Sequence, residues 1–319
     1  MPTAPQLTTR RFTDDQHTYV NHGPQVLAVS WGLTALATGF ILLRLYCKLL
    51  VSFRRLWWDD WLMIAAWLLV IATDIQSTVL VTDYGFGKHN GDMKLATPED
   101  VAGFYLIYGA RATTIMTSQV WAKTSFAVTL LRLTTDRIRQ FVWAIIISIN
   151  LAGIISATTP WVECTPLQKS WNRALPGKCW TDEAGQTLWV VTSTYLAAID
   201  FILALIPWKF LWGLTLKKKE KWGILIAMSM GVVAGTVALI KVTKLAALSS
   251  ASDPFDAMEL LNWDVIEATV TIMASCIPAL RVFLRDIKSS SEENGPFDNS
   301  ISLRTYQARG LGYVRTNNS

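Results

Sequence analysis

Charged residues stand inside long apolar runs of this sequence, where an ionised side chain is costly unless it is paired or hydrated. Arg111 and Lys123 both lie in the run 105–132. They are twelve residues apart, which is about 18 Å along a helix at about 1.5 Å per residue, so they mark two depths. The other charged residues of this kind are Asp74, Asp200, Lys241, Asp264 and Glu267.

Two kinds of chemistry fit residues of these types. A buried carboxylic acid that keeps its proton can transfer it to an apolar substrate such as an epoxide or an alkene, and Asp200 and Glu267 are the candidate catalytic acids. Opposite charges around a polar cavity can instead bind a small ligand. The residues expected to contribute to such a ligand site are Asp74, Arg111, Lys123, Asp200, Lys241, Asp264 and Glu267.

Simpler explanations exist for several of these positions. Asp264 and Lys244 can lie at the water interface, and Lys123 can extend its ammonium group toward the membrane surface. Asp200 and Asp74 are deeper and shorter, which favours a buried pair or a polar cavity, although a buried pair can be purely structural. The expected partners of Lys123 are Asp200, Asp59 and Asp60.

The elements that must position these residues are membrane helices. Hydrophobic residues make up 51% of the chain, its mean hydropathy is +0.31, and charged residues make up 17%, below the roughly 25% of soluble domains. The 15 tryptophans suit membrane interfaces. We predict an all-α polytopic membrane protein with a seven-helix bundle. Its expected spans are residues 25–46, 61–82, 105–132, 141–162, 187–212, 222–247 and 263–284.

The basic residues predict the orientation of this bundle. One set of connections carries 15 Lys and Arg residues and the other carries 7. Because the richer side faces the cytosol, the amino terminus is predicted outside and the carboxyl terminus inside. Residues 1–24 then form an outer tail, 25–286 the membrane domain, and 287–319 a disordered cytosolic tail. The serines of that tail are candidate phosphorylation sites, unless the tail has no role.

The cysteines agree with that orientation. Cys164 and Cys179 fall in an outer connection, where an oxidising compartment permits a disulfide, and the alternative is two unpaired thiols. Such a bond would close a loop of about 15 residues and add about 3 kcal/mol of stability. Cys47 and Cys276 are expected to be structural, although Cys47 at the cytosolic end of the first span is also a candidate for palmitoylation.

Other kinds of site are not expected. His17, His22 and His89 have no metal-binding spacing, and the sequence contains neither a phosphate-binding loop nor a nucleophile elbow. We therefore expect no metal and no cofactor. The basic residues flank apolar spans, so nucleic acid is not an expected partner. Membrane lipid is, and the basic stretch 217–221 in the third inner loop can attract anionic lipid or a cytosolic signalling partner.

Several short motifs together resemble those of fungal integral membrane proteins with a rhodopsin-like domain. The resemblance extends from about Val26 to Leu284. It implies a seven-helix fold, with members that are receptor-like or that belong to secondary-metabolite gene clusters. The matching motifs are Trp57-Trp58-Asp59-Asp60, Gly85-Phe86-Gly87-Lys88-His89, Lys123-Thr124-Ser125, Leu131-Arg132, Cys164-Thr165-Pro166 with Trp171 and Cys179, Asp200 with Pro207, and Glu267 with Cys276-Ile277-Pro278.

Departures from the family narrow the functions to consider. Span 263–284 contains no lysine that could carry retinal as a Schiff base, so a pigment is not expected. No cysteine-rich domain precedes the first span, which weakens a role in surface sensing. We expect a receptor-like or regulatory protein in the plasma membrane or an internal membrane. The alternative is a membrane-embedded, cyclase-like enzyme or an accessory protein of a secondary-metabolite pathway, and a transporter is a weaker third hypothesis.

Overall fold

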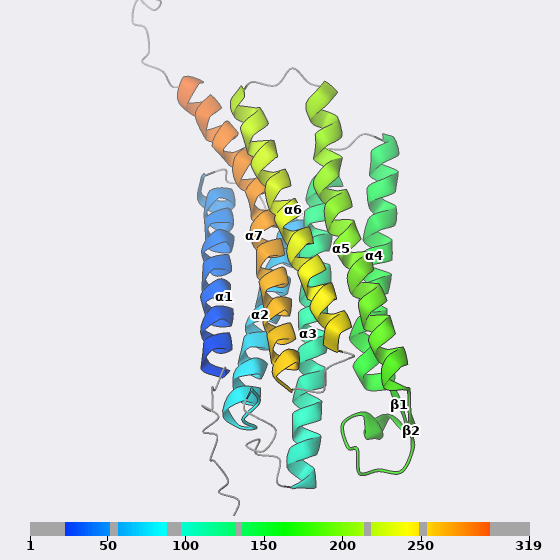
Figure 1. Ribbon diagram of the computed structural model, residues 1–319. Helices are drawn as coiled ribbons and strands as arrows, with labels where there is room; N and C mark the ends of the chain where they lie inside the picture. Colours follow the sequence, from blue (N-terminus) through cyan, green and yellow to red (C-terminus); the bar gives the residue numbers. More distant parts are fainter. Residues whose placement is uncertain are drawn as a thin grey trace, which may run out of the picture.

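Seven long α-helices lie side by side in the part of the chain that the structure, a computed structural model, describes (Figure 1). The described residues are 23–51, 57–87, 97–131, 136–213, 218–248 and 254–293. The helices are α1 (Gly23–Tyr46), α2 (Trp58–Thr82), α3 (Pro98–Leu131), α4 (Asp136–Val162), α5 (Asp182–Gly213), α6 (Lys218–Leu248) and α7 (Pro254–Glu293). A short π-helix, η1 (Cys47–Val51), continues α1.

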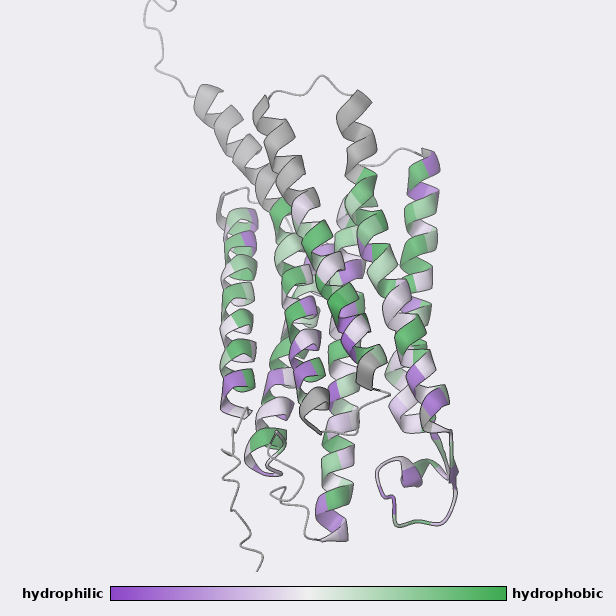
Figure 2. Cartoon of the chain, viewed as in Figure 1, coloured by the Kyte–Doolittle hydropathy of each residue, from purple (hydrophilic) through white to green (hydrophobic). Residues whose placement is uncertain are grey.

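The helices have the length and composition of membrane spans. Six spans among the described residues are long and apolar enough to cross a bilayer, and α3 is the helix of the bundle that lies outside this set. Hydrophobic positions cover most of the bundle, with isolated hydrophilic ones inside the helices (Figure 2). The predicted all-α, multi-pass membrane fold is thereby confirmed. The orientation of its termini stays a prediction, and residues 1–22 and 294–319 lie outside the described residues.

All seven helices begin before their predicted apolar spans, and α3 and α7 do so by the most residues. α3 begins at Pro98, ahead of the apolar run that starts at Tyr105, because Thr97 caps it: its hydroxyl donates to Asp100 Oδ2 at 2.7 Å and accepts from the Asp100 amide at 3.1 Å. The side-chain hydrogen bond from Thr97 lowers the pKa of Asp100. α7 begins at Pro254 and continues through Glu293, past the predicted start of the tail at residue 287.

Small residues bring the central helices together. Ala66 of α2, Ala122 of α3 and Ala268 of α7 are fully buried in one apolar cluster with Ala37 and Ile41 of α1. Small side chains let membrane helices approach closely, and the van der Waals contacts between the helices then stabilise the bundle. A second cluster joins α3, α4 and α5. The helix pairs that pack most extensively are α2 with α3, α5 with α6, and α6 with α7.

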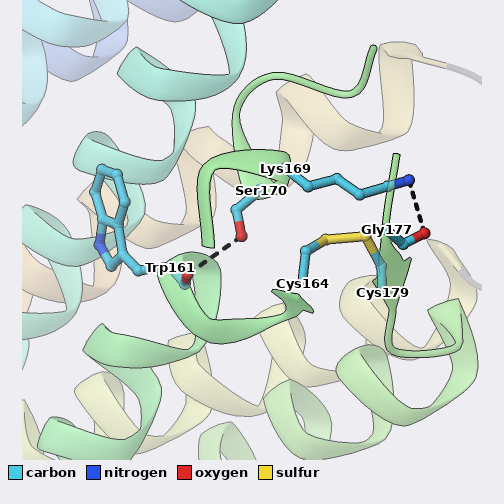
Figure 3. Close-up of a disulfide and its surroundings, with 6 residues drawn as sticks. All are labelled: Trp161, Cys164, Lys169, Ser170, Gly177 and Cys179. Atoms are coloured by element: carbon cyan, nitrogen blue, oxygen red, sulfur yellow. Dashed lines mark hydrogen bonds between the residues drawn. A yellow bond between two sulfur atoms is a disulfide. The ribbon is translucent and has the colours of Figure 1, made fainter. Parts of the chain in front are cut away.

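The bundle has two distinct ends. The loop that carries Cys164 and Cys179 lies at the lower end in Figure 1, where α1 also begins, and we call this the disulfide end. The predicted disulfide is confirmed, and the strands β1 (Cys164–Thr165) and β2 (Lys178–Cys179) pair antiparallel beside it (Figure 3). Lys169 donates to the Gly177 carbonyl at 2.9 Å, which closes the loop further. By the predicted orientation this end faces outside.

A glycine turn follows α2 at the disulfide end. Gly85 and Gly87 have φ values of 69° and 95°, a region that L side chains rarely adopt. The turn places Phe86 between them inside the bundle, where its ring lies 5.5 Å from that of Phe104 on α3. A Cβ at Gly87 would also collide with Met258 of α7. The Gly-Phe-Gly part of the sequence motif therefore serves packing between α2, α3 and α7.

Candidate functional site

Helix α3 is the element that ties the bundle together. Three consecutive residues of its Lys123-Thr124-Ser125 motif reach different helices. Lys123 contacts α5 and α7, Thr124 accepts from Asn150 of α4 at 3.0 Å, and Ser125 donates to the Asp59 carbonyl of α2 at 2.7 Å. Because successive residues of a helix point about 100° apart, one short motif can fix three neighbours at once.

Lys123 lies at the centre of a buried group of charges. Its ammonium group donates to Asp200 Oδ2 of α5 at 2.6 Å and to Glu267 Oε1 of α7 at 3.1 Å. The Lys123 side chain is 1% exposed, so the alternative that its ammonium group extends to the membrane surface does not hold. Of its expected partners, Asp200 is confirmed, whereas Asp59 and Asp60 contact other bases.

The ion pairs continue from Glu267 toward the disulfide end. Lys241 of α6 contacts Glu267 Oε2 at 2.6 Å and Asp264 Oδ1 at 3.4 Å. Asp264 Oδ2 in turn lies 3.5 Å from the guanidinium of Arg111 on α3. Acids and bases alternate without a break along this path. We call this set the ion-pair chain; its members in order are Arg111, Asp264, Lys241, Glu267, Lys123 and Asp200.

The ion-pair chain is almost fully removed from solvent. The side chain of Asp264 is 13% exposed, and those of the other five members are at most 6% exposed. An unpaired charge in such surroundings is strongly destabilising, so each base needs its acid. Its members come from four helices, α3, α5, α6 and α7. The ion-pair chain therefore fixes the relative positions of these helices.

Arg111 is held by more than its ion pair. Its Nε donates to Ser77 Oγ of α2 at 2.8 Å, and its terminal nitrogen donates to the Leu261 carbonyl of α7 at 2.7 Å. Gln119, about two helical turns further along α3, donates to the Asp264 carbonyl at 3.1 Å. The part of α3 nearer the disulfide end is therefore hydrogen-bonded to both α2 and α7.

Asp74 lies apart from the ion-pair chain. It is fully buried on α2, and its carboxylate accepts hydrogen bonds from two hydroxyl groups of α1, those of Ser30 and Thr34, the latter at 2.6 Å. No cationic group of the described residues lies within ion-pair distance of it. Asp74 was expected beside Arg111, Lys241 and the other charges; α1 hydroxyl groups solvate it in their place.

A small pocket opens next to Asp74 at the disulfide end. Its cavity volume is about 10 Å³, which is room for about one water molecule. Ser30 and Ser77 line it together with Arg111 and Asn262, and apolar side chains form most of the remaining wall. The buried amide oxygen of Asn262 has no hydrogen-bond partner. The apolar wall consists of Val26, Leu27, Leu80, Val81, Phe86, Met258, Leu261 and Val265.

A second buried charge cluster occupies the opposite end of the bundle. Arg44 of α1 donates to Asp59 at 2.7 Å and to Asp60 at 3.0 Å, and it also donates to the Ser275 carbonyl of α7 at 2.7 Å. Lys48 of η1 contacts Asp60 Oδ2 at 2.5 Å and Asp59 at 3.4 Å. We call these four residues the junction cluster, because they join the end of α1 to the start of α2.

The junction cluster explains the Trp57-Trp58-Asp59-Asp60 motif. Asp59 and Asp60 are 1% exposed, whereas Trp57 and Trp58 are exposed at the start of α2. Tryptophan is typical of membrane interfaces, so the motif combines an interfacial anchor with two internal acids. The sequence contained a signal for this cluster: two bases and two acids flank one short connection. Arg44 and Lys48 also belong to the basic residues that predict the orientation of the bundle.

Most of the expected site residues come together in the bundle. Six of the seven form the ion-pair chain, and Asp74 lies near Arg111 without pairing with it. Lys244 is outside the group: it contacts Glu259 at 3.0 Å with 46% of its side chain exposed, as expected of an interfacial residue. The described residues hold no group of His, Cys, Asp or Glu with the arrangement of a metal site.

Comparisons with known proteins agree with the sequence motifs. The model of the fungal rhodopsin domain matches residues 43–286. The chain is 26% identical over 274 residues to the polyenoic acids biosynthesis gene cluster protein Ba17b of Metarhizium anisopliae. The aligned stretch covers 82% of this chain and 73% of that protein. No solved structure matches significantly.

Two further relatives match over shorter stretches. The fugralins biosynthesis cluster protein 2 of Gibberella zeae is 24% identical over 127 residues, 39% of this chain and 31% of that protein. The satratoxin biosynthesis SC1 cluster protein 4 of Stachybotrys chartarum is 28% identical over 129 residues, 40% of this chain and 45% of that protein. All three relatives carry names of fungal biosynthesis clusters.

Proposed function

Since this chain belongs to the fungal rhodopsin domain family, we propose that it is a receptor-like regulatory protein of a secondary-metabolite pathway and carries no retinal. The names of the three relatives support the pathway. α7 contains no lysine before Lys288, so a Schiff base in its membrane-crossing part has no residue to form on. The buried lysines of α3 and α6 are both engaged by carboxylates.

The observation that carries the receptor role is the continuity of the ion-pair chain. It begins at Arg111, which lines the pocket at the disulfide end, and runs through α6 and α7 to Asp200 of α5. A small apolar ligand that enters from the disulfide end and displaces Arg111 or Asp264 alters the pairing of every later member. Alternating buried charges have few stable arrangements, which suits a switch between discrete states.

The output of such a switch is expected at the opposite end of α5 and α6. The basic stretch 217–221 connects to α6 there, and we propose that it contacts a cytosolic signalling partner or anionic lipid. Replacing Lys218, Lys219 and Lys221 together by Gln is expected to abolish the response of pathway transcripts while leaving the protein folded. Quantitative transcript analysis of the strain that carries the gene measures this; normal transcript levels in the variant contradict the receptor role.

A second candidate function is supported by the same cluster of residues. Asp200 of α5 and Glu267 of α7 are interior carboxyl groups that share Lys123, and an enzyme or accessory protein of the pathway can use such groups as acids. Against this, each of them is bound by a buried lysine, so neither carboxyl group can reach a substrate without breaking an ion pair. The receptor role is therefore our conclusion.

Metabolite mass spectrometry separates the two candidates. We would compare the native gene, a deletion, and the Asp200→Asn and Glu267→Gln alleles. A regulatory role predicts a joint fall in all products of the pathway without a new compound. Accumulation of one defined precursor in the deletion and in an acid allele would contradict regulation and support catalysis.

A further inference from the structure

Two exposed guanidinium groups lie at the start of α4 with no acid beside them. The structure describes the side chains of five arginines. Arg44 and Arg111 are buried in ion pairs, and the guanidinium of Arg173 lies 4.5 Å from the centre of a tyrosine ring on α3. Arg137 and Arg139 are exposed, and no acid of the described residues lies within ion-pair distance of either. These two bases are therefore available to an anion from outside the chain.

The exposed face of α4 continues from these two bases as an apolar row. Its side chains are 49 to 65% exposed and follow one another at intervals of three or four residues, so they lie along one side of the helix. Residues two positions apart are about 200° apart around a helix, so Arg137 and Arg139 flank this row at its start. We call the row the α4 strip; its members are Trp143, Ile147, Leu151 and Ile154.

The charged start of the α4 strip lies on the cytosolic side in the predicted orientation. α4 ends at Val162 beside the disulfide loop, so its first residues lie at the opposite end of the bundle (Figure 1). Anionic lipids are concentrated in the cytosolic leaflet of a membrane. The strip from Trp143 to Leu151 is about 12 Å long, within the roughly 15 Å of hydrocarbon in one leaflet. The two bases therefore lie at the level of lipid headgroups, and the strip lies at the level of their acyl chains.

We propose that the α4 strip binds one anionic phospholipid, whose headgroup lies between Arg137 and Arg139 and whose acyl chain lies along the strip. A guanidinium group binds phosphate or carboxylate oxygens through paired N–H donors. Phosphatidylserine brings both anions, one for each guanidinium, whereas phosphatidylcholine brings a single phosphate and a bulky cation. The indole ring of Trp143 suits the interface between headgroup and hydrocarbon. This site is independent of the receptor role, because none of its residues belongs to the ion-pair chain.

The test is thermal unfolding of the full chain in detergent that contains phosphatidylserine or phosphatidylcholine with the same acyl chains. We expect saturable stabilisation by phosphatidylserine, about 2 to 4 °C beyond that by phosphatidylcholine. The double variant Arg137→Gln with Arg139→Gln should raise the phosphatidylserine mole fraction at half-effect about 25-fold, because each base near an anionic surface contributes about fivefold. The variant is expected to fold, since both side chains are exposed.

Lys218→Gln with Lys219→Gln is the charge-matched control, since it removes two bases at the same end of the bundle, where α6 begins. It should shift the half-effect mole fraction much less. Equal shifts in the two double variants would overturn the proposal in favour of a diffuse charge effect. Equal stabilisation of the native chain by the two lipids would overturn it as well. So would equal stabilisation by glycerophosphoserine, which has the same headgroup without acyl chains.

Discussion

The junction cluster and the ion-pair chain are both buried sets of alternating charges, yet they are assembled differently. Partners in the junction cluster lie 11 to 16 residues apart, around the one connection between α1 and α2. Partners of Lys123 lie 77 and 144 residues away on α5 and α7. The first cluster therefore closes a local corner, whereas the second exists only when four helices have packed.

This difference suggests different roles for the junction cluster and the ion-pair chain, although both consist of buried ion pairs. Replacing a whole buried ion pair by apolar or neutral residues is often neutral for stability, so the mere presence of a pair does not show that the fold needs it. A local corner is sufficient to explain the junction cluster. The ion-pair chain links helices that already pack through apolar clusters. We therefore propose that it serves function and is not required for assembly.

The largest loss of stability is expected for Lys123→Met. The change leaves Asp200 without its ion-pair partner and Glu267 with Lys241 alone. Breaking a buried pair from one side costs about 3 to 5 kcal/mol, and thermal unfolding in detergent measures it. The double variant Lys123→Met with Asp200→Asn should recover most of that loss. A single variant as stable as the native chain would show that these charges are hydrated.

A smaller loss is expected for Arg44→Met in the junction cluster. Lys48 still contacts both Asp59 and Asp60 after the change, and its side chain is 8% exposed, so water can assist it. We expect a cost of about 2 to 3 kcal/mol, part of it from the lost bond to the Ser275 carbonyl. The same unfolding assay measures it. A cost above that of Lys123→Met would contradict the local character of this cluster.

The smallest effect is expected for Lys244→Gln. Its ion pair with Glu259 joins α6 to α7 as the ion-pair chain does, but the two side chains are 46% and 38% exposed. Exposed pairs contribute about 0 to 1 kcal/mol, so the unfolding temperature should barely change. This variant provides the exposed reference for the two buried clusters. A loss comparable to that of Arg44→Met would mean that this end of α6 is buried in the membrane protein.

The sequence was sufficient to predict the architecture and part of the site. Long apolar runs predicted all seven helices, and the two cysteines in one loop predicted their disulfide. Charges at membrane depth placed Asp200 among the three expected partners of Lys123, and it is the one that Lys123 contacts. These predictions depend on local composition or on depth, which a sequence records directly.

The remaining pairings depend on helix rotation, which a sequence does not record. The three-residue spacing of Asp264 and Glu267 puts them on one face of a helix. Only the packing of α7 against α3 and α6 turns that face toward Lys123 and Lys241. Asp74 was grouped with the charges, yet its face of α2 turns toward the hydroxyl groups of α1. Asn262 carried no signal at all, since an amide near an interface is ordinary.

The central claim is that the ion-pair chain serves function and the junction cluster serves assembly. Two charge-neutral double variants test it most directly: Lys123→Met with Asp200→Asn, and Lys48→Met with Asp60→Asn, each of which removes one buried base together with one acid. The measurement is the metabolite profile of strains that carry each variant, with protein abundance as the control. We predict the profile of the deletion for the first variant and the native profile for the second. A native profile for both, at native abundance, would contradict the claim.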